Sequence, residues 1–395
     1  MTDTKEPEIK TYTKETEIKT DVKTDENMVL QKIDGVYRYC RSEHIQNQML
    51  AEKLMKMYGS SQCLITPSGM AAISCALNGL LNYFSGKDLV NIFYSHELFS
   101  ATPGLIKSIK ESAYMINVLD SASVIQLFTA KGRNQFNILF LESCTNPHGF
   151  IFDFSLIPEL RKLSKQLFVI VDNTWLSCAS FNPLIFGADI VVTSLTKYYS
   201  GGNAIGGAVL KNAEYVSSNN NYFDKIIRYS TQNGFHVSPV NAQIILNNIT
   251  DVETRIAKTS AITKSLIETY SDKIEIIHPL LNSHPSNELA KKYLKYWPSV
   301  FVIKVNTSKN KAIGLMSQNS QIEYKTSFGG KDNRFDTYPK IIDGIVHCRF
   351  AVGYNDDKDI IKGFDEFVKK LSIQPPNPIN ENQTNQTKSK KHTKT

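Results

Sequence analysis

The sequence predicts an α/β fold built on a mostly parallel sheet, and three short apolar runs carry this prediction. They cover residues 167–171, 190–193 and 204–210, and their length and β-branched content are typical of buried strands. The ligand crevice of such a sheet lies beyond the carboxyl ends of its strands. Asp172 and Lys197, which follow the first two runs, are therefore candidates for one site.

Further elements extend the same pattern. We expect strands at residues 88–94, 136–141 and 299–305, and helices at 48–58, 157–166 and 240–265. A strand, a helix and a strand at the spacing found between residues 136 and 171 indicate a right-handed parallel crossover.

Composition places the chain among ordinary globular proteins. It has 395 residues, 41% hydrophobic and 21% charged, which is enough for two domains with a sizeable core. The net charge of +7 does not predict a nucleic-acid partner, because much of the lysine lies in the terminal segments. The body has no stripe of basic residues interleaved with aromatics.

The six cysteines are scattered, without a CxxC pair or a metal-ligand spacing. We therefore expect no metal site and a reducing, cytoplasmic location. No apolar run approaches the ~18 residues of a membrane span, so no membrane association is expected. The acidic residues of the N-terminal segment also argue against a transit peptide.

A lysine and an aspartate at neighbouring strand ends suit one particular chemistry. Pyridoxal phosphate (PLP) needs a lysine amine for its covalent link and a carboxylate to keep its ring nitrogen protonated. Lys197 and Asp172 would supply these groups, and Ser194 and Thr196 would bring hydroxyls to the phosphate. Taken singly, Asp172 fits a turn residue equally well and Lys197 a solvated charge.

Three segments together resemble the Cys/Met-metabolism family of PLP enzymes, the group of cystathionine γ-synthase, cystathionine lyase and methionine γ-lyase. They are VDNTW, GADIVVTSLTKYYSGG and IGGAVL, and the separation of Asp172 and Lys197 is also that of the family. The resemblance covers most of residues 39–371. It implies a type I, aminotransferase-like fold with a seven-stranded sheet in a large domain and a smaller α/β C-terminal domain.

The resemblance also implies the cofactor contacts. Lys197 would carry the PLP, and Phe99 would stack on its ring at a position where the family usually has a tyrosine. Tyr39 and Arg41 would reach the phosphate of a neighbouring subunit. The full implied set is Tyr39, Arg41, Ser68, Gly69, Met70, Phe99, Asn146, Asp172, Thr174, Ser194, Thr196 and Lys197.

For the substrate, the resemblance implies that Arg349 binds an α-carboxylate and that Ser327 orients it. Lys197 and Phe99 would be the catalytic positions, in β- or γ-elimination or γ-replacement on sulfur amino acids or activated homoserine. The sequence departs from the family at 44–46, 202–203 and 331–348, and Phe99 lacks a hydroxyl. A degenerate PLP-binding homologue with an altered reaction or a regulatory or scaffold role is the alternative.

The expected organisation follows from these assignments. Disordered tails are expected at residues 1–27 and 373–395, an N-terminal arm and helix at 28–60, a PLP-binding domain at 61–235 and a small domain at 236–372. The arm would contact a neighbouring subunit, so a homodimer or homotetramer is expected. The remaining expected partner is a small amino-acid substrate.

Overall fold

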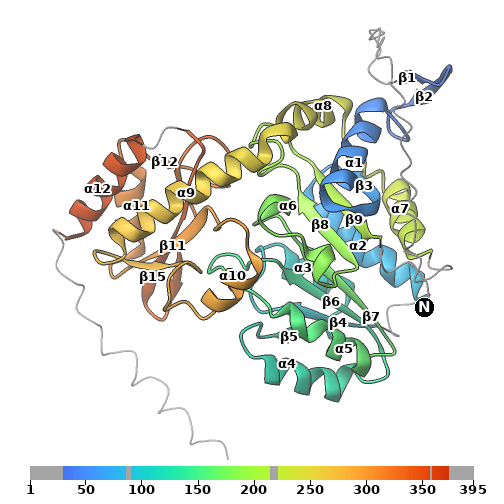
Figure 1. The fold of residues 1–395 in the computed structure, drawn as a ribbon, viewed down its shortest axis with the longest axis horizontal. Helices are drawn as coiled ribbons and strands as arrows, with labels where there is room; N and C mark the ends of the chain where they lie inside the picture. Colours follow the sequence, from blue (N-terminus) through green and yellow to red (C-terminus); the bar gives the residue numbers. More distant parts are fainter. Residues whose placement is uncertain (1–29, 86–89, 214–220, 356–357, 373–395) are drawn as a thin grey trace, which may run out of the picture.

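Two sheets organise the part of the chain that the computed structural model describes, residues 30–85, 90–213, 221–355 and 358–372. Figure 1 shows the larger sheet on the right and the smaller one on the left, with helix α9 (Val252–Tyr270) running along the top toward the smaller one. The tails predicted at 1–27 and 373–395 lie outside the described residues.

The larger sheet has seven strands in the order β3-β9-β8-β7-β6-β4-β5. All pairings from β5 through β8 are parallel, whereas β9 runs antiparallel to both β8 and β3. The predicted mostly parallel sheet is confirmed. The strands are β3 Ser60–Thr66, β4 Val90–Ser95, β5 Tyr114–Ile116, β6 Phe136–Glu142, β7 Gln166–Asp172, β8 Ile190–Ser194 and β9 Gly207–Asn212.

The central strands read as continuous apolar runs because both faces of the sheet are covered. Along β7, Val169 and Val171 face one hydrophobic core, and Phe168 and Ile170 face the other. Helices α2, α3 and α7 pack into the second core, and α1, α5, α8 and part of α9 into the first. The helices of this part are α1 Ile45–Tyr58, α2 Gly69–Tyr83, α3 Thr102–Ile109, α4 Ser121–Leu127, α5 Ile157–Leu163, α6 Ser177–Ser180, α7 Tyr222–Gln232 and α8 Pro239–Asn248.

The smaller sheet is mostly antiparallel, in the order β10-β11-β15-β13-β12 with β14 also paired to β15. It packs its own apolar core, rich in phenylalanine, against α9, α11 and α12. The elements are β10 Glu275–Ile277, α10 Asn287–Tyr293, β11 Val300–Val305, α11 Lys309–Ser317, β12 Glu323–Tyr324, β13 Arg334–Phe335, β14 Lys340–Ile342, β15 Ile345–Ala351 and α12 Lys358–Ser372.

Several predicted boundaries are wrong by a few residues. The strand predicted at 204–210 begins at Gly207, the strand predicted at 299–305 begins at Val300, and the helix predicted at 157–166 ends at Leu163. The strand predicted at 88–94 is described from Val90 onward.

The helix predicted at 240–265 is two helices, α8 and α9, joined by a 3₁₀ turn at Ile249–Asp251. Arg255 supports the break. Its guanidinium donates to the carbonyl of Asn248 at 2.6 Å and to that of Tyr198 at 2.6 Å. The Asn248 carbonyl at the end of α8 is thus satisfied. The bond to Tyr198 ties the start of α9 to the segment that follows β8.

A two-stranded hairpin, β1 (Leu30–Ile33) and β2 (Val36–Tyr39), projects from the body at the upper right of Figure 1. Its turn residues Asp34 and Gly35 have φ of 49° and 81°, the left-handed pair that tight hairpins favour. This exposed hairpin and helix α1 make up most of the described part of residues 28–60, where the sequence predicts an N-terminal arm and helix.

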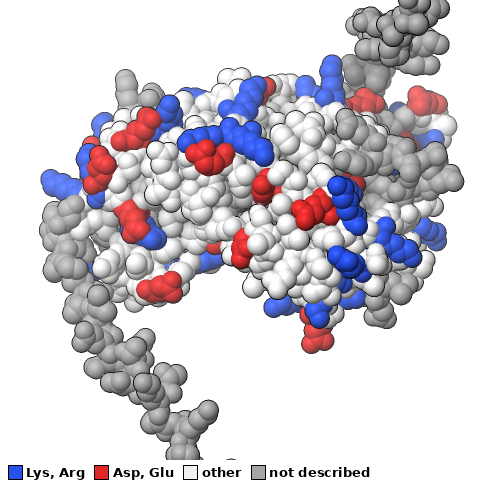
Figure 2. All heavy atoms as spheres, turned by 60° about the horizontal axis from the view of Figure 1, so that its bottom comes forward, with Lys and Arg blue, Asp and Glu red and all other residues white. Residues whose placement is uncertain are grey.

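The molecular surface carries charges of both signs, and the cysteines, all in the described part of the chain, form no disulfides. Positive and negative side chains are interspersed over the face seen in Figure 2. All six cysteines carry free thiols. Over the described residues, no helix has the length and apolar character needed to cross a bilayer.

The packing of α2 on α7 predicts a sharp difference between two glycines. A Cβ on Gly79 would lie 2.5 Å from the Cα of Ile226, whereas a Cβ on Gly104 in α3 would meet nothing within 4 Å. We expect Gly79→Ala to destabilise the fold by about 1–3 kcal/mol because the helices must separate. Gly104→Ala should be neutral or stabilising by up to about 1 kcal/mol. Denaturant midpoints measure both, and equal midpoints for the two variants would contradict this packing.

Candidate active site

A cavity of about 610 Å³ lies at the carboxyl ends of the parallel strands, with residues of the smaller sheet forming its other wall. Its volume is within the range of small-molecule sites. Most of the residues proposed from the sequence line it. They are Ser68, Gly69, Met70, Phe99, Asn146, Asp172, Thr174, Ser194, Thr196, Lys197, Ser327 and Arg349.

Asp172 ends strand β7 and is held rigidly by one neighbour. Its Oδ1 accepts from the backbone N–H of Thr174 at 3.0 Å and from the hydroxyl of the same residue at 2.5 Å. Burial raises the pKa of Asp172 to about 6, against the lowering effect of the Thr174 hydrogen bonds and of the charge of Lys197. With Oδ1 occupied, Oδ2 is the oxygen left for a ligand.

Glu142 lies beside Asp172, because the two residues are direct partners at the ends of β6 and β7. Its oxygens accept from the backbone N–H groups of Phe99 and Asn146, at 2.5 and 3.1 Å. Burial first, and then the charge of Asp172, raise the pKa of Glu142 well above its usual value. A protonated Glu142 beside an ionised Asp172 keeps two like charges from meeting.

Lys197 follows β8 in a tight turn that ends in glycines. Its Nζ donates to the hydroxyl of Ser327 at 3.0 Å and lies 5.2 Å from the ring centre of Phe328. Burial, followed by the charges of Arg349 and Arg334, lowers the pKa of Lys197 to about 8. The lowered pKa increases the uncharged fraction of this amine near neutral pH, and the uncharged form is the one that acts as a nucleophile or base.

The start of helix α2 meets the end of β8 closely. Ser68 caps the helix, its hydroxyl accepting from Ala71 N–H at 3.2 Å, so the N–H groups of Gly69 and Met70 have no acceptor within the helix. A Cβ on Gly69 would lie 2.8 Å from the Cβ of Ser194. The missing side chain lets helix N–H groups and the Ser194 hydroxyl converge on one point, as an anion site needs.

Arg349, on β15, is engaged by two other cavity residues. Its guanidinium lies 3.0 Å from the carboxylate of Asp336 and donates to Asn146 Oδ1 at 3.1 Å. Burial lowers the pKa of Arg349 and Asp336 opposes this effect. A carboxylate already sits where a substrate carboxylate would bind, so binding would exchange one anion for another.

Of three further predicted site residues, Phe99 lies at the cavity, whereas Tyr39 and Arg41 do not. Phe99 lines the cavity with 43% of its surface exposed, as a stacking ring requires. Tyr39 and Arg41 lie outside the lining residues, on and beside the exposed hairpin, with the Arg41 guanidinium 5.3 Å from the Tyr39 ring centre. One chain does not bring these two to its own cavity.

The sequence prediction missed several wall residues: Glu142, Trp175, Asp336, Tyr338, Lys340 and His347. Glu142 could have been found from its place at a strand end beside Asp172. His347 could have been found from its position two residues before Arg349, on the same face of a strand. Asp336, Tyr338 and Lys340 lie in the segment that departs from the family, where no motif marked them.

The residues present fit PLP. The anion site at α2 and Ser194 suits its phosphate, Asp172 Oδ2 suits a protonated ring nitrogen, and the amine of Lys197 shares the cavity with both. Thr196 is less available than predicted, because its hydroxyl donates to the carbonyl of Gly206 at 3.3 Å.

Comparison with known proteins agrees with this chemistry. The model of the Cys/Met metabolism PLP-dependent enzyme family matches residues 11–366. L-methionine γ-lyase of Fusobacterium nucleatum subsp. polymorphum is 26% identical over 355 residues, covering 85% of this chain and 87% of the relative. Cystathionine β-lyase of Lactococcus lactis subsp. cremoris is 24% identical over 353 residues, covering 85% and 89%.

Among solved structures, cystathionine γ-synthase of Xanthomonas oryzae pv. oryzae in complex with cystathionine superposes with a TM-score of 0.75 at 21% identity, covering 88% of this chain and 93% of the other. This likeness confirms the type I fold. Together with the family match over most of the chain, it leads to one conclusion: the chain belongs to the Cys/Met metabolism family of PLP-dependent enzymes.

Proposed function

We propose that the enzyme acts on sulfur amino acids or activated homoserine, by β- or γ-elimination or by γ-replacement. One observation carries the proposal: the amine of Lys197, the carboxylate of Asp172 and the guanidinium of Arg349 face a single cavity. These are the groups needed to hold PLP and an amino acid together. The free thiols of the chain fit a reducing compartment, so we also propose a cytoplasmic location.

PLP, when bound, supplies an electron sink for the electron pair left on the substrate's α carbon. The protein residues do the rest. Lys197, with its pKa lowered to about 8, takes the proton from Cα as a general base and can transfer it to or from Cβ. Asp172 keeps the proton on the ring nitrogen, and the N–H groups of Gly69 and Met70 bind the phosphate.

Arg349 positions the amino acid by a bidentate contact with its α-carboxylate. Asp336 must then give up its place on the guanidinium. Ser327 lines the same cavity and accepts a hydrogen bond from Lys197 Nζ. The exchange of one carboxylate for another keeps the buried arginine paired.

The Asp336–Arg349 pair and the missing hydroxyl at Phe99 also favour a second candidate function. A chain whose carboxylate site is closed by its own aspartate could bind PLP without turning over amino acids. Release of ammonia and a 2-oxo acid distinguishes an enzyme from such a binding protein.

The environment of Lys197 predicts its reactivity. In cofactor-free protein, competitive acylation should label Lys197 half-maximally near pH 8, because burial and the charge of Arg349 disfavour the ammonium form. Arg349→Met should move this midpoint upward, and Arg228→Met, on the exposed face of α7, should not. Mass spectrometry of the labelled peptide gives the midpoint. A value near 10.5, the ordinary value, would contradict the proposed base.

A substrate panel tests the reaction. Cystathionine, methionine, cysteine and an activated homoserine should include at least one substrate that yields ammonia and 2-oxo acid. Lys197→Ala should abolish this release together with the visible absorbance of the bound cofactor. Arg349→Lys should raise KM about 10- to 100-fold, since a charged hydrogen-bonded fork contributes about 1.5–3 kcal/mol. Arg228→Lys is the control, and no release from any substrate would favour the binding protein.

We also propose that the chain forms a homodimer or homotetramer in which Arg41 of one subunit reaches the phosphate of the next. The exposed position of Tyr39 and Arg41 supports this. Light scattering should give at least a dimer. Arg41→Ala should keep that mass while weakening PLP binding about 10-fold or more, and Arg38→Ala on the same hairpin should not. A PLP-loaded monomer would overturn the proposal.

A further inference from the structure

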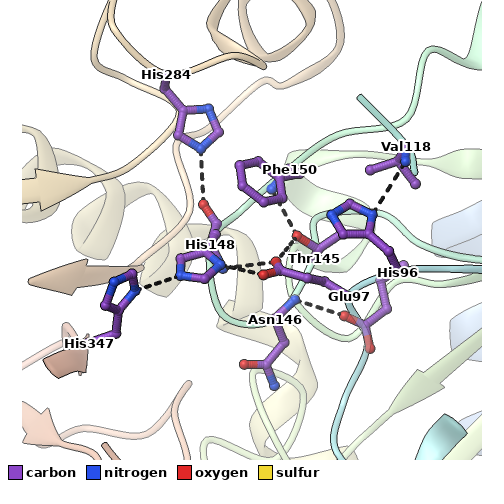
Figure 3. Close-up of polar contacts among 10 residues, drawn as sticks. His96, Glu97, Val118, Thr145, Asn146, His148, Phe150, His284 and His347 are labelled. Carbon is purple, nitrogen blue, oxygen red and sulfur yellow. Dashed lines mark hydrogen bonds and ion pairs between the residues drawn. The ribbon is translucent and has the colours of Figure 1, made fainter. Parts of the chain in front are cut away.

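Three polar side chains, Glu97, His148 and His347, contact one another in sequence (Figure 3). Glu97 follows strand β4, His148 lies in the loop after β6, and His347 lies on β15 of the smaller sheet. One oxygen of Glu97 contacts His148 Nδ1, and His148 Nε2 lies 2.8 Å from His347 Nδ1. His347 lines the cavity, so the chain ends where the substrate binds.

Further hydrogen bonds fix the Glu97 end of this chain. The second oxygen of Glu97 accepts from the Thr145 hydroxyl at 2.8 Å and from the His148 N–H at 3.4 Å. His284 Nε2 lies 3.0 Å from the His148 carbonyl. Burial alone would raise the pKa of Glu97, but its hydrogen bond to His148 and the charge of that ring bring the pKa below its usual value. Glu97 is therefore a carboxylate placed to balance a positive charge on His148.

At the other end of the chain, the Nε2 atom of His347 is available to a ligand. His347 Nδ1 faces His148, and across the described residues no hydrogen bond engages its Nε2. Burial, and then the charges of His148 and Lys304, lower the pKa of His347. The other charged groups around it are Lys340, its neighbour on β14, and Glu275 on β10.

The spacing of His347 and Arg349 along β15 indicates which part of the substrate His347 would contact. His347 and Arg349 are two residues apart on one face of β15, about 7 Å along the strand, and both line the cavity. The sulfur of a sulfur amino acid lies only a few bonds from its carboxylate. With the carboxylate on Arg349, an amino acid extended along the strand brings its sulfur toward His347.

Metal binding by these side chains, or proton transfer by Glu142 or Asp336, has less structural support. Throughout the described part of the chain, no group of three or more His, Cys, Asp or Glu side chains is placed to hold a metal ion. Glu142 is held by two backbone N–H groups and Asp336 by Arg349. Of the titratable cavity groups, His347 is the one backed by a chain of proton carriers.

We propose that Glu97, His148 and His347 form a proton relay that protonates the departing sulfur of the substrate. This inference rests on the proposed function and adds the group that handles the leaving thiolate. When the carbon–sulfur bond breaks, its electron pair stays on sulfur. His347 gives its Nε2 proton to sulfur and takes the Nε2 proton of a positively charged His148 at Nδ1. His148 ends neutral beside the Glu97 carboxylate, and solvent returns one proton.

Leaving-group dependence tests the relay. His347→Asn and Glu97→Gln should slow elimination of alkyl thiols about 10²-fold or more, the usual contribution of a general acid. Elimination of chloride from β-chloroalanine needs no proton on the leaving group and should keep its rate within about 3-fold. His236→Asn, on an exposed loop, is the matched control and should affect neither reaction.

The outcomes separate the two proposals. Equal slowing of both reactions by His347→Asn would overturn the relay while leaving the proposed function standing. Wild-type protein that releases neither thiol nor chloride, and that does not turn over an activated homoserine, would overturn the proposed function itself. Thermal melts of both variants show whether a loss of rate reflects loss of fold.

Ring-nitrogen NMR of histidine in cofactor-free protein gives a readout independent of activity. The His347 proton should move from Nε2 to Nδ1 as the pH rises, with a single midpoint. Glu97→Gln should lower the midpoint by about one pH unit or more, and His236→Asn should leave it in place. A His347 proton that stays on one nitrogen from pH 5 to 9 would overturn the relay.

Discussion

Burial of charge at the carboxyl edge of the larger sheet is the constraint on which the site depends. Parallel pairing places Glu142 and Asp172 directly side by side, and both are buried. Two adjacent carboxylates cannot both be ionised in a dry site. Thr174 bonds and the nearby Lys197 favour charge on Asp172, and Glu142 takes the proton. Asp172 Oδ2, at this edge of the sheet, is therefore the negatively charged oxygen that suits a cationic ring nitrogen.

Close backbone approach is the second requirement. A Cβ on Gly207 would lie 2.2 Å from the carbonyl oxygen of Ser68, and one on Gly69 would press on Ser194. These two positions let β9 and the start of α2 close around the end of β8. The anion site proposed there therefore depends on the absence of side chains as much as on the hydroxyls that the sequence displays.

Consecutive strands and their end residues could be predicted because burial on both faces leaves a strong pattern. The runs that became β6, β7 and β8 were placed nearly residue by residue, and so were Asp172 and Lys197. The break between α8 and α9 was missed, since it depends on Arg255 binding carbonyls distant in sequence. Asp336 was missed because its significance arises only when the smaller sheet meets the larger one, whereas the spacing of His347 from Arg349 along one strand was a signal that the sequence did contain.

The cavity has two walls, one formed by the larger sheet and one by the smaller sheet. The cofactor floor is made by successive strand ends of one sheet, whereas Arg349 and His347 come from β15 of the other. Contacts that cross between them, the 3.1 Å bond from Arg349 to Asn146 and the 2.8 Å contact of His148 with His347, therefore depend on the spacing of the two sheets. A hydrogen bond weakens steeply beyond about 3.5 Å, so a displacement of less than about 1 Å is enough to disconnect the relay. The proposed carboxylate site at Arg349 lies on the same strand as His347, so we expect a bound amino acid and a connected relay to favour the same arrangement of the two sheets.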